Sequence, residues 1–148
     1  MLLATSCEIY EQDGTVFAQR HLAVAERNPE SSTECFMNQE DYKSCIEACI
    51  ECAQACEHCA TACLAERDVK MMVECIRLDR DCAELCFGAA AFMSRDSRFA
   101  QQLCAVCAEV CDACGAECRK HKMDHCQECA DACERCAEEC RHMSGANV

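Results

Sequence analysis

The chain has 148 residues, of which 21 are cysteine and none is tryptophan, and its formal net charge is −13 at pH 7. This length suits a single domain. The acidity disfavours nucleic acids and anionic membranes as partners, because both are bound through basic side chains.

The number of cysteines indicates the compartment. An odd count in a chain without a secretory signal argues against a disulfide framework. Residues 1–6 are apolar but too short for a signal sequence, and no apolar run is long enough to span a membrane. We therefore expect a cytoplasmic protein whose thiols stay reduced.

Residues 1–37 are predicted to form an N-terminal extension and linker. Residues 15–27 have the apolar spacing of a short helix, which Pro29 would end. Cys7 and Cys35 lie outside any regular cysteine pattern, so we expect them to be free cysteines.

The first main helix is predicted to begin after Asn38, with Glu40 and Asp41 in its first turn, and to run to about Glu66. Its cysteines follow one another at steps of four and three residues, which keeps them on one side of an α-helix. Alanine, glutamate and glutamine, all good helix formers, surround them. These inward cysteines are Cys45, Cys49, Cys52, Cys56, Cys59 and Cys63.

The second helix is predicted to be capped by Asp68 and to run to about Ser94. Its inward positions keep the same spacing but hold fewer cysteines. They are Met72, Cys75, Asp79, Cys82, Cys86, Ala89 and Met93. Asp79 is the one inward carboxylate of this helix, and we expect it to hydrogen-bond a neighbour or pair with an arginine.

The third and fourth helices repeat the pattern of the first. The third is predicted over about 96–121, and the fourth follows Asp124, which forms a capping-box pattern with Gln127. Their inward cysteines are Cys104, Cys107, Cys111, Cys114 and Cys118, and then Cys126, Cys129, Cys133, Cys136 and Cys140.

The short connections between these helices force sequential neighbours to run antiparallel. The predicted fold is therefore all-α: an up-down-up-down four-helix bundle with a cysteine-lined core over residues 38–143, followed by a tail at 144–148. Apolar side chains also lie away from the inward stripes, and they indicate a further contact such as a homo-oligomer interface. They are Ile76, Leu78, Leu85, Phe87, Phe92, Val106 and Val110.

Structural roles do not account for nineteen inward cysteines. As small hydrophobes they would explain one or two positions per helix, whereas Leu and Val would bury more area and resist oxidation. Cysteines four residues apart on a helix are too far apart to form a disulfide readily. The sequence has no catalytic triad, phosphate-binding glycine loop or carboxylate pair, so we do not expect an enzyme.

Metal binding is the leading interpretation, and ligand chemistry ranks the metals. Zinc takes four ligands in a tetrahedron, and iron–sulfur clusters take about four thiolates each, so neither explains a continuous sulfur lining. Copper(I) is soft, selects thiolate and thioether, and accepts two or three sulfurs. A zinc or mixed-metal thiolate buffer and, with less support, an iron–sulfur redox protein remain as alternatives.

Charge balance predicts the number of ions. Nineteen buried thiolates without metal would be very costly to desolvate, so metal-free thiols should be protonated and binding should release protons. One monovalent ion per thiolate brings the core to neutrality. The predicted capacity is of order twenty copper(I) ions per chain.

The segments Cys75-Ile-Arg-Leu-Asp-Arg-Asp-Cys-Ala-Glu-Leu-Cys86, Cys104–Cys140 and Cys45-Ile-Glu-Ala-Cys-Ile-Glu-Cys52 resemble the bacterial cytosolic copper storage proteins. The resemblance covers about residues 39–143. It implies a four-helix bundle that fills its core with copper(I) and assembles as a tetramer. For a copper store we also expect copper chaperones or copper-requiring enzymes as partners. The first 34 residues depart from the compact members of that family.

Soft and borderline ligands gather at one end of the predicted bundle, where the first and third helices end and the second and fourth begin. They are Cys63, Met72, Cys75, Cys118, His121, Met123, His125 and Cys126. The resemblance also implies that copper enters at a histidine-bearing end. We therefore add His121, His125 and Met72 to the nineteen cysteines as predicted ligands, and expect Met93, His142 and Met143 to close the opposite end.

Overall fold

The computed structural model describes residues 11–12, 15–16 and 40–145 of a chain that divides into two compact units, 1–34 and 35–148. In the first unit, β1 (Glu11–Gln12) pairs antiparallel with β2 (Thr15–Val16). The predicted helix over 15–27 is thus wrong at its start, because two β-branched residues follow an Asp-Gly sequence that favours a hairpin turn. Its remainder, 17–27, lies outside the described residues.

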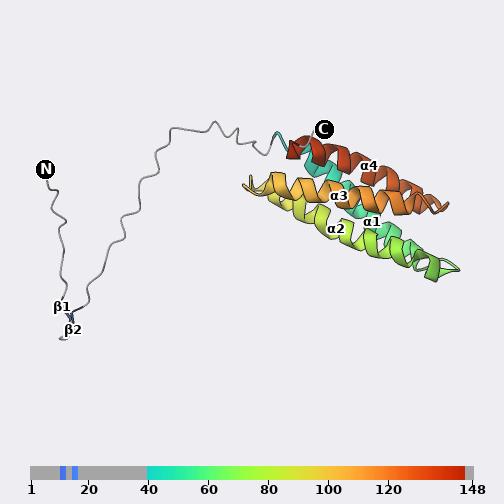
Figure 1. Cartoon of the computed structure of the whole chain (residues 1–148), viewed down its shortest axis with the longest axis horizontal. Helices are drawn as coiled ribbons and strands as arrows, with labels where there is room; N and C mark the ends of the chain where they lie inside the picture. The colour runs from blue at the N-terminus through green and yellow to red at the C-terminus, as the bar shows by residue number, and fades with distance from the viewer. Residues whose placement is uncertain (1–10, 13–14, 17–39, 146–148) are drawn as a thin grey trace. The chain divides into compact units, whose positions relative to one another are not determined.

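The second unit contains α1 (Lys43–Cys63), α2 (Val73–Ser94), α3 (Ala100–Cys118) and α4 (Asp124–Ser144), with a 3-10 helix, η1 (Val69–Met72), before α2. Helix α1 packs against α2 and α4, and α3 packs against the same two helices (Figure 1). This arrangement confirms the antiparallel four-helix bundle. No helix in the described part of the chain is long and apolar enough to cross a membrane.

Helix α1 begins later than predicted. Its first residue is Lys43, so Glu40 and Asp41 precede its first turn, and the predicted cap, Asn38, lies outside the described residues. The backbone N–H of Lys43 bonds the carbonyl of Glu40 over 3.3 Å, which makes this segment a tight turn leading into the helix. The helix ends at Cys63, a few residues before the predicted end.

Helix α3 also begins later than predicted, at Ala100 rather than near residue 96. Asp96 has a φ of 49°, in the left-handed region. The N–H of Ser97 bonds the carbonyl of Phe92 over 3.0 Å, so Asp96 ends α2 in the way that a glycine usually ends a helix. Helix α2 ends at Ser94, as predicted.

The other two predicted side-chain caps, Asp68 and Asp124, are wrong. Asp68 precedes η1 rather than α2, and its side chain makes no capping hydrogen bond. Asp124 is the first residue of α4, with no side-chain capping bond at that terminus. The side-chain amide of Gln127 instead donates to the carbonyl of His121, which ties the α3–α4 connection to the first turn of α4.

Small side chains allow the helices to approach closely. Between the cysteines, the buried positions hold alanines such as Ala53, Ala83 and Ala130. A Cβ built on Gly115 of α3 would lie 3.2 Å from the Cβ of Cys133 in α4, closer than ordinary van der Waals contact. Gly115 therefore permits the close contact between α3 and α4.

Candidate metal centre

The interior of the bundle is a column of sulfur atoms. Every cysteine in 40–145 is free and at most 1% exposed, which confirms the predicted inward orientation of all nineteen. Sulfurs from different helices approach one another closely: Sγ of Cys75 lies 3.5 Å from Sγ of Cys118, and Sγ of Cys86 lies 3.6 Å from Sγ of Cys107. These distances are typical of neighbouring thiols and far longer than a disulfide bond.

The column contains groups of four thiols whose Sγ atoms all lie within 4.8 Å of one another. Neighbouring groups share cysteines. In the order in which the groups are named next, the second and third share Cys52 and Cys82, and the third and fourth share Cys56 and Cys133. Five of the groups are Cys49/Cys107/Cys136/Cys140, Cys52/Cys82/Cys86/Cys111, Cys52/Cys56/Cys82/Cys133, Cys56/Cys114/Cys129/Cys133 and Cys59/Cys63/Cys75/Cys126.

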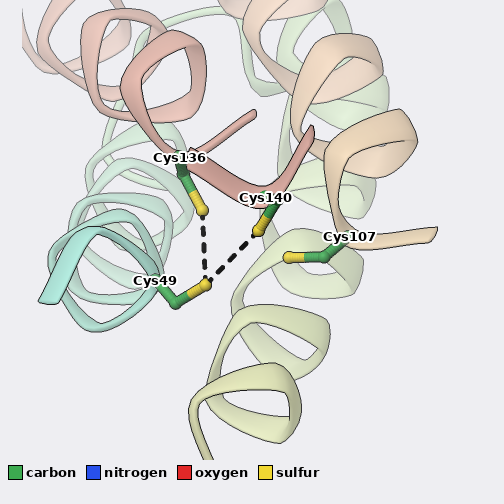
Figure 2. Close-up of side chains that lie close together, drawn as sticks. All are labelled: Cys49, Cys107, Cys136 and Cys140. Atoms are coloured by element: carbon green, nitrogen blue, oxygen red, sulfur yellow. Dashed lines mark hydrogen bonds between the residues drawn. The ribbon is translucent and has the colours of Figure 1, made fainter. Parts of the chain in front are cut away.

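Figure 2 shows how one group is assembled from three helices. Cys49 comes from α1, Cys107 from α3, and Cys136 and Cys140 from successive turns of α4. The Sγ of Cys49 lies 3.6 Å from the sulfurs of both Cys136 and Cys140. The alternation of three- and four-residue steps is what brings successive turns of one helix to the same group.

Asp79 is a completely buried carboxyl group surrounded by thiols. Its Oδ1 accepts hydrogen bonds from Cys114, Cys118 and Cys129 at 3.2–3.4 Å, and its Oδ2 accepts one from Cys75 at 3.6 Å. Burial raises the pKa of Asp79 to about 10, because the ionised carboxylate would be removed from water. The prediction that Asp79 hydrogen-bonds a neighbour is confirmed.

The histidine-bearing end of the bundle, which we call the mouth, consists of Cys59, Cys63, Cys75 and Cys126 together with His125. Nδ1 of His125 lies 3.5 Å from Sγ of Cys59 and 3.4 Å from Sγ of Cys126. The structure thus brings His125 against the thiols, as predicted.

The other two predicted non-cysteine ligands are placed differently. Nε2 of His121 lies 3.6 Å from Oε1 of Glu117, and among the described residues it has no hydrogen-bond partner. Met72 is buried, with 3% of its surface exposed. No described contact joins either side chain to a cysteine sulfur by a hydrogen bond.

The opposite end is closed by larger side chains. The Sγ of Cys104 donates to Sδ of Met93 over 3.5 Å, and Met93 is completely buried. Tyr42 and Met143 are at most 5% exposed and belong to the same core. The expected closing role of Met93 and Met143 agrees with this burial, whereas His142 is exposed.

The sequence pattern did not identify two residues of this region, Glu66 at the mouth and Tyr42 at the opposite end. Glu66, predicted only as the approximate end of a helix, lies 3.2 Å from Nε2 of His125. Tyr42, just before α1, is 4% exposed. For Glu66 the signal available was its position one turn after Cys63, in the connection that leads to the mouth.

Burial governs the protonation of the thiols at the mouth. Burial is the main reason why the pKa of the Cys63 thiol is raised. It is also the main reason why the pKa of the Cys126 thiol is raised to about 11. Cys63 and Cys126 are therefore protonated at neutral pH in the metal-free protein. The donor set of thiol sulfurs with one imidazole nitrogen fits soft or borderline metal ions, which bind after the thiols lose their protons.

Comparisons with known proteins agree with this geometry. The chain is 54% identical over 83 residues to the uncharacterized cysteine-rich protein YhjQ of Bacillus subtilis, a match that covers 56% of this chain and 77% of that protein. A Cu(I)-bound copper storage protein, BsCsp3, is 53% identical, with a TM-score of 0.68, over 70% of this chain and 97% of that chain.

A cytosolic copper storage protein from Streptomyces lividans, solved with five coppers, is 42% identical, with a TM-score of 0.70, over 72% of this chain and 94% of that chain. The model of the copper storage protein family matches residues 38–145. This match spans the four helices and every cysteine of the sulfur column. The chain therefore belongs to the copper storage protein family.

Proposed function

We propose that this protein is a cytosolic store that binds of order twenty copper(I) ions per chain through its core thiolates. The observation that carries the proposal is the sharing of Cys52, Cys56, Cys82 and Cys133 between adjoining groups. Shared sulfurs can bridge neighbouring ions, so the whole column can fill at about one ion per thiolate rather than one ion per four.

Charge supports the same stoichiometry. One Cu(I) per thiolate neutralises the buried column, and the ions replace the thiol protons. The ligands would be the nineteen cysteines, with His125 at the mouth and with His121 and Met72 nearby. The store is not an enzyme, because its work is to hold Cu(I) away from water and oxidants.

Delivery and assembly complete the proposal. The Streptomyces lividans relative is described as cytosolic, and we assign the same compartment to this chain. Copper chaperones and copper-requiring enzymes would be its donors and acceptors. Phe87 and Val106, 46% and 49% exposed, supply apolar surface for a homo-oligomer, a tetramer by analogy with the family.

An anaerobic titration of reduced apo-protein with Cu(I) against a competing chelator tests this function. We expect saturation near one ion per core thiolate. Replacing Cys52, Cys56, Cys111 and Cys133 together by Ser should lower the capacity by about four ions and weaken binding of those that remain. Cys7→Ser/Cys35→Ser is the matched control and should leave the capacity unchanged. Unaltered tight binding in the fourfold variant would refute storage in the column.

The second candidate is a zinc buffer, and it rests on the groups of four thiols within 4.8 Å. Such a group can surround one tetrahedral zinc ion. With four thiolates per ion and each thiolate bound to one ion, about four or five zinc ions would fit, and about half of the thiolate charge would stay uncompensated. Saturation near a quarter of the thiol count would favour zinc. An iron–sulfur protein would instead show visible absorption after anaerobic purification.

A further inference from the structure

His125 is held at both ring nitrogens by groups of different chemistry. Its Nδ1 faces Sγ of Cys59 and Sγ of Cys126 at 3.5 and 3.4 Å. Its Nε2 lies 3.2 Å from Oε1 of Glu66. The imidazole is 14% exposed and Glu66 is 36% exposed, so the carboxylate lies on the outer side of the ring.

This arrangement determines which nitrogen carries the proton. A neutral imidazole has one N–H donor and one acceptor nitrogen, and an ionised carboxylate only accepts. With Glu66 at Nε2, the proton belongs on Nε2, and Nδ1 presents its lone pair to the thiols. Carboxylates that hold a metal-binding histidine in this way fix the tautomer and ring orientation and raise the basicity of the ligand nitrogen.

We propose that Glu66 is a positioning residue for copper uptake, which keeps His125 in the Nε2–H tautomer with Nδ1 aimed at Cys59 and Cys126. The role rests on the proposed storage function. It makes Nδ1 a preformed nitrogen ligand that faces two sulfur atoms, so an arriving Cu(I) ion meets one donor that need not lose a proton first.

The second histidine of this end offers an internal comparison. Glu117 lies 3.6 Å from Nε2 of His121, beyond hydrogen-bond distance, and it is bound instead by Nζ of Lys120 at 2.5 Å. An acidic residue near a histidine at this end of the bundle therefore does not always form a hydrogen bond with the ring, whereas Glu66 does so with His125. The Glu66–His125 pair requires the connection that follows α1 to meet the start of α4, although the two residues are 59 positions apart.

Three variants of the full chain separate positioning from charge. Glu66→Leu removes the acceptor, while Glu66→Gln keeps a side-chain carbonyl that accepts the Nε2 proton. Glu74→Leu removes an equally negative but exposed carboxylate that pairs with Arg77. In each variant, nitrogen NMR of the reduced metal-free protein at about pH 7.5 reports the tautomer of His125. Stopped-flow transfer of Cu(I) from a chelate reports the rate of loading.

We expect the Nε2–H tautomer in the unsubstituted chain, in Glu66→Gln and in Glu74→Leu. In Glu66→Leu the tautomers should mix, and the loading rate should fall by about 10-fold at unchanged final capacity. An Nδ1–H tautomer or an imidazolium in the unsubstituted chain would overturn the proposal, as would a Glu66→Leu variant with an unaltered tautomer. Since the tautomer is measured without copper, a chain that failed to store copper would refute the proposed function and leave the positioning contact intact.

Discussion

The Sγ of Cys114 donates a hydrogen bond to Oδ1 of Asp79 over 3.2 Å, which links α3 to the buried carboxyl group of α2. Cys118 and Cys129 donate to the same oxygen, so one carboxyl oxygen joins thiols of two helices. Asp79 is thus an oxygen centre within the sulfur column, and its protonation affects the stability of the metal-free bundle.

The metal-free protein should lose stability as pH rises between about 5 and 8 because of Asp79. Its pKa is raised to about 10 by burial, whereas in the unfolded chain the carboxyl ionises at its ordinary, much lower pKa. The folded state therefore binds one proton more across this range, and the stabilisation is complete only below the unfolded pKa. Asp79→Asn should flatten the dependence, as measured by anaerobic urea unfolding.

Asp81→Asn, which changes an exposed residue of the same helix, is the control for Asp79→Asn. It should retain the pH dependence of the unsubstituted protein. If the free energy of unfolding changed equally with pH in all three proteins, the pKa of Asp79 would have to be the same in the folded and unfolded states.

Adding a methyl group at Gly115 should destabilise the bundle. The new Cβ would lie 3.2 Å from Cβ of Cys133 and 3.6 Å from the carbonyl oxygen of Ala130, so α3 and α4 would have to separate. We expect Gly115→Ala to cost about 1–3 kcal/mol in the free energy of unfolding, more than the gain in helix propensity. Thermal unfolding of the reduced protein, followed by circular dichroism, measures this change.

Gly88→Ala provides the matched comparison for Gly115→Ala. Nothing lies within 4 Å of a Cβ at Gly88 in α2, so the same substitution should stabilise the protein by about 0.5–1 kcal/mol. If both alanine variants were stabilised alike, close packing of α3 on α4 would not be the reason for Gly115.

Copper binding should release nearly one proton per thiolate that becomes a ligand. Burial raises the pKa of Cys63 and raises the pKa of Cys126 to about 11, so these thiols are protonated at neutral pH. The apparent affinity for Cu(I) should therefore increase with pH between about 6 and 8. Anaerobic titration in weakly buffered solution with a pH indicator counts the protons. Release of only a few protons at full loading would mean that the metal-free core already holds thiolates.

Met93→Leu should leave the copper capacity unchanged. The thioether accepts a hydrogen bond from Cys104, but it is neutral and contributes no charge for an ion to balance. Leucine has a similar volume, so the loss of stability should be below about 1.5 kcal/mol. Cys104→Ser, at the other member of the contact, should lower the capacity by about one ion in the same titration. A loss of ions in Met93→Leu would identify Met93 as a ligand.

Much of the fold follows from local sequence patterns. The steps of three and four residues in segments such as Cys104–Cys118 predict both the helices and their inward faces, because helical periodicity depends only on neighbouring residues. Helix ends were predicted less well. Asp68, Asp96 and Asp124 have side chains that suit helix termini, yet the backbone at each position follows the connection between packed helices.

The sequence by itself determined that this is a cysteine-lined four-helix bundle, because periodicity, helix propensity and short connections all predict the same arrangement. Only the tertiary structure decided which sulfurs form common groups, that Asp79 accepts hydrogen bonds from four thiols, and that Glu66 meets His125. Apart from the bond between Cys75 and Asp79 within α2, these contacts join residues that lie on different helices or on a helix and a connection. They depend on the relative rotation and height of the packed helices, which side-chain packing at every layer sets together and no local pattern encodes.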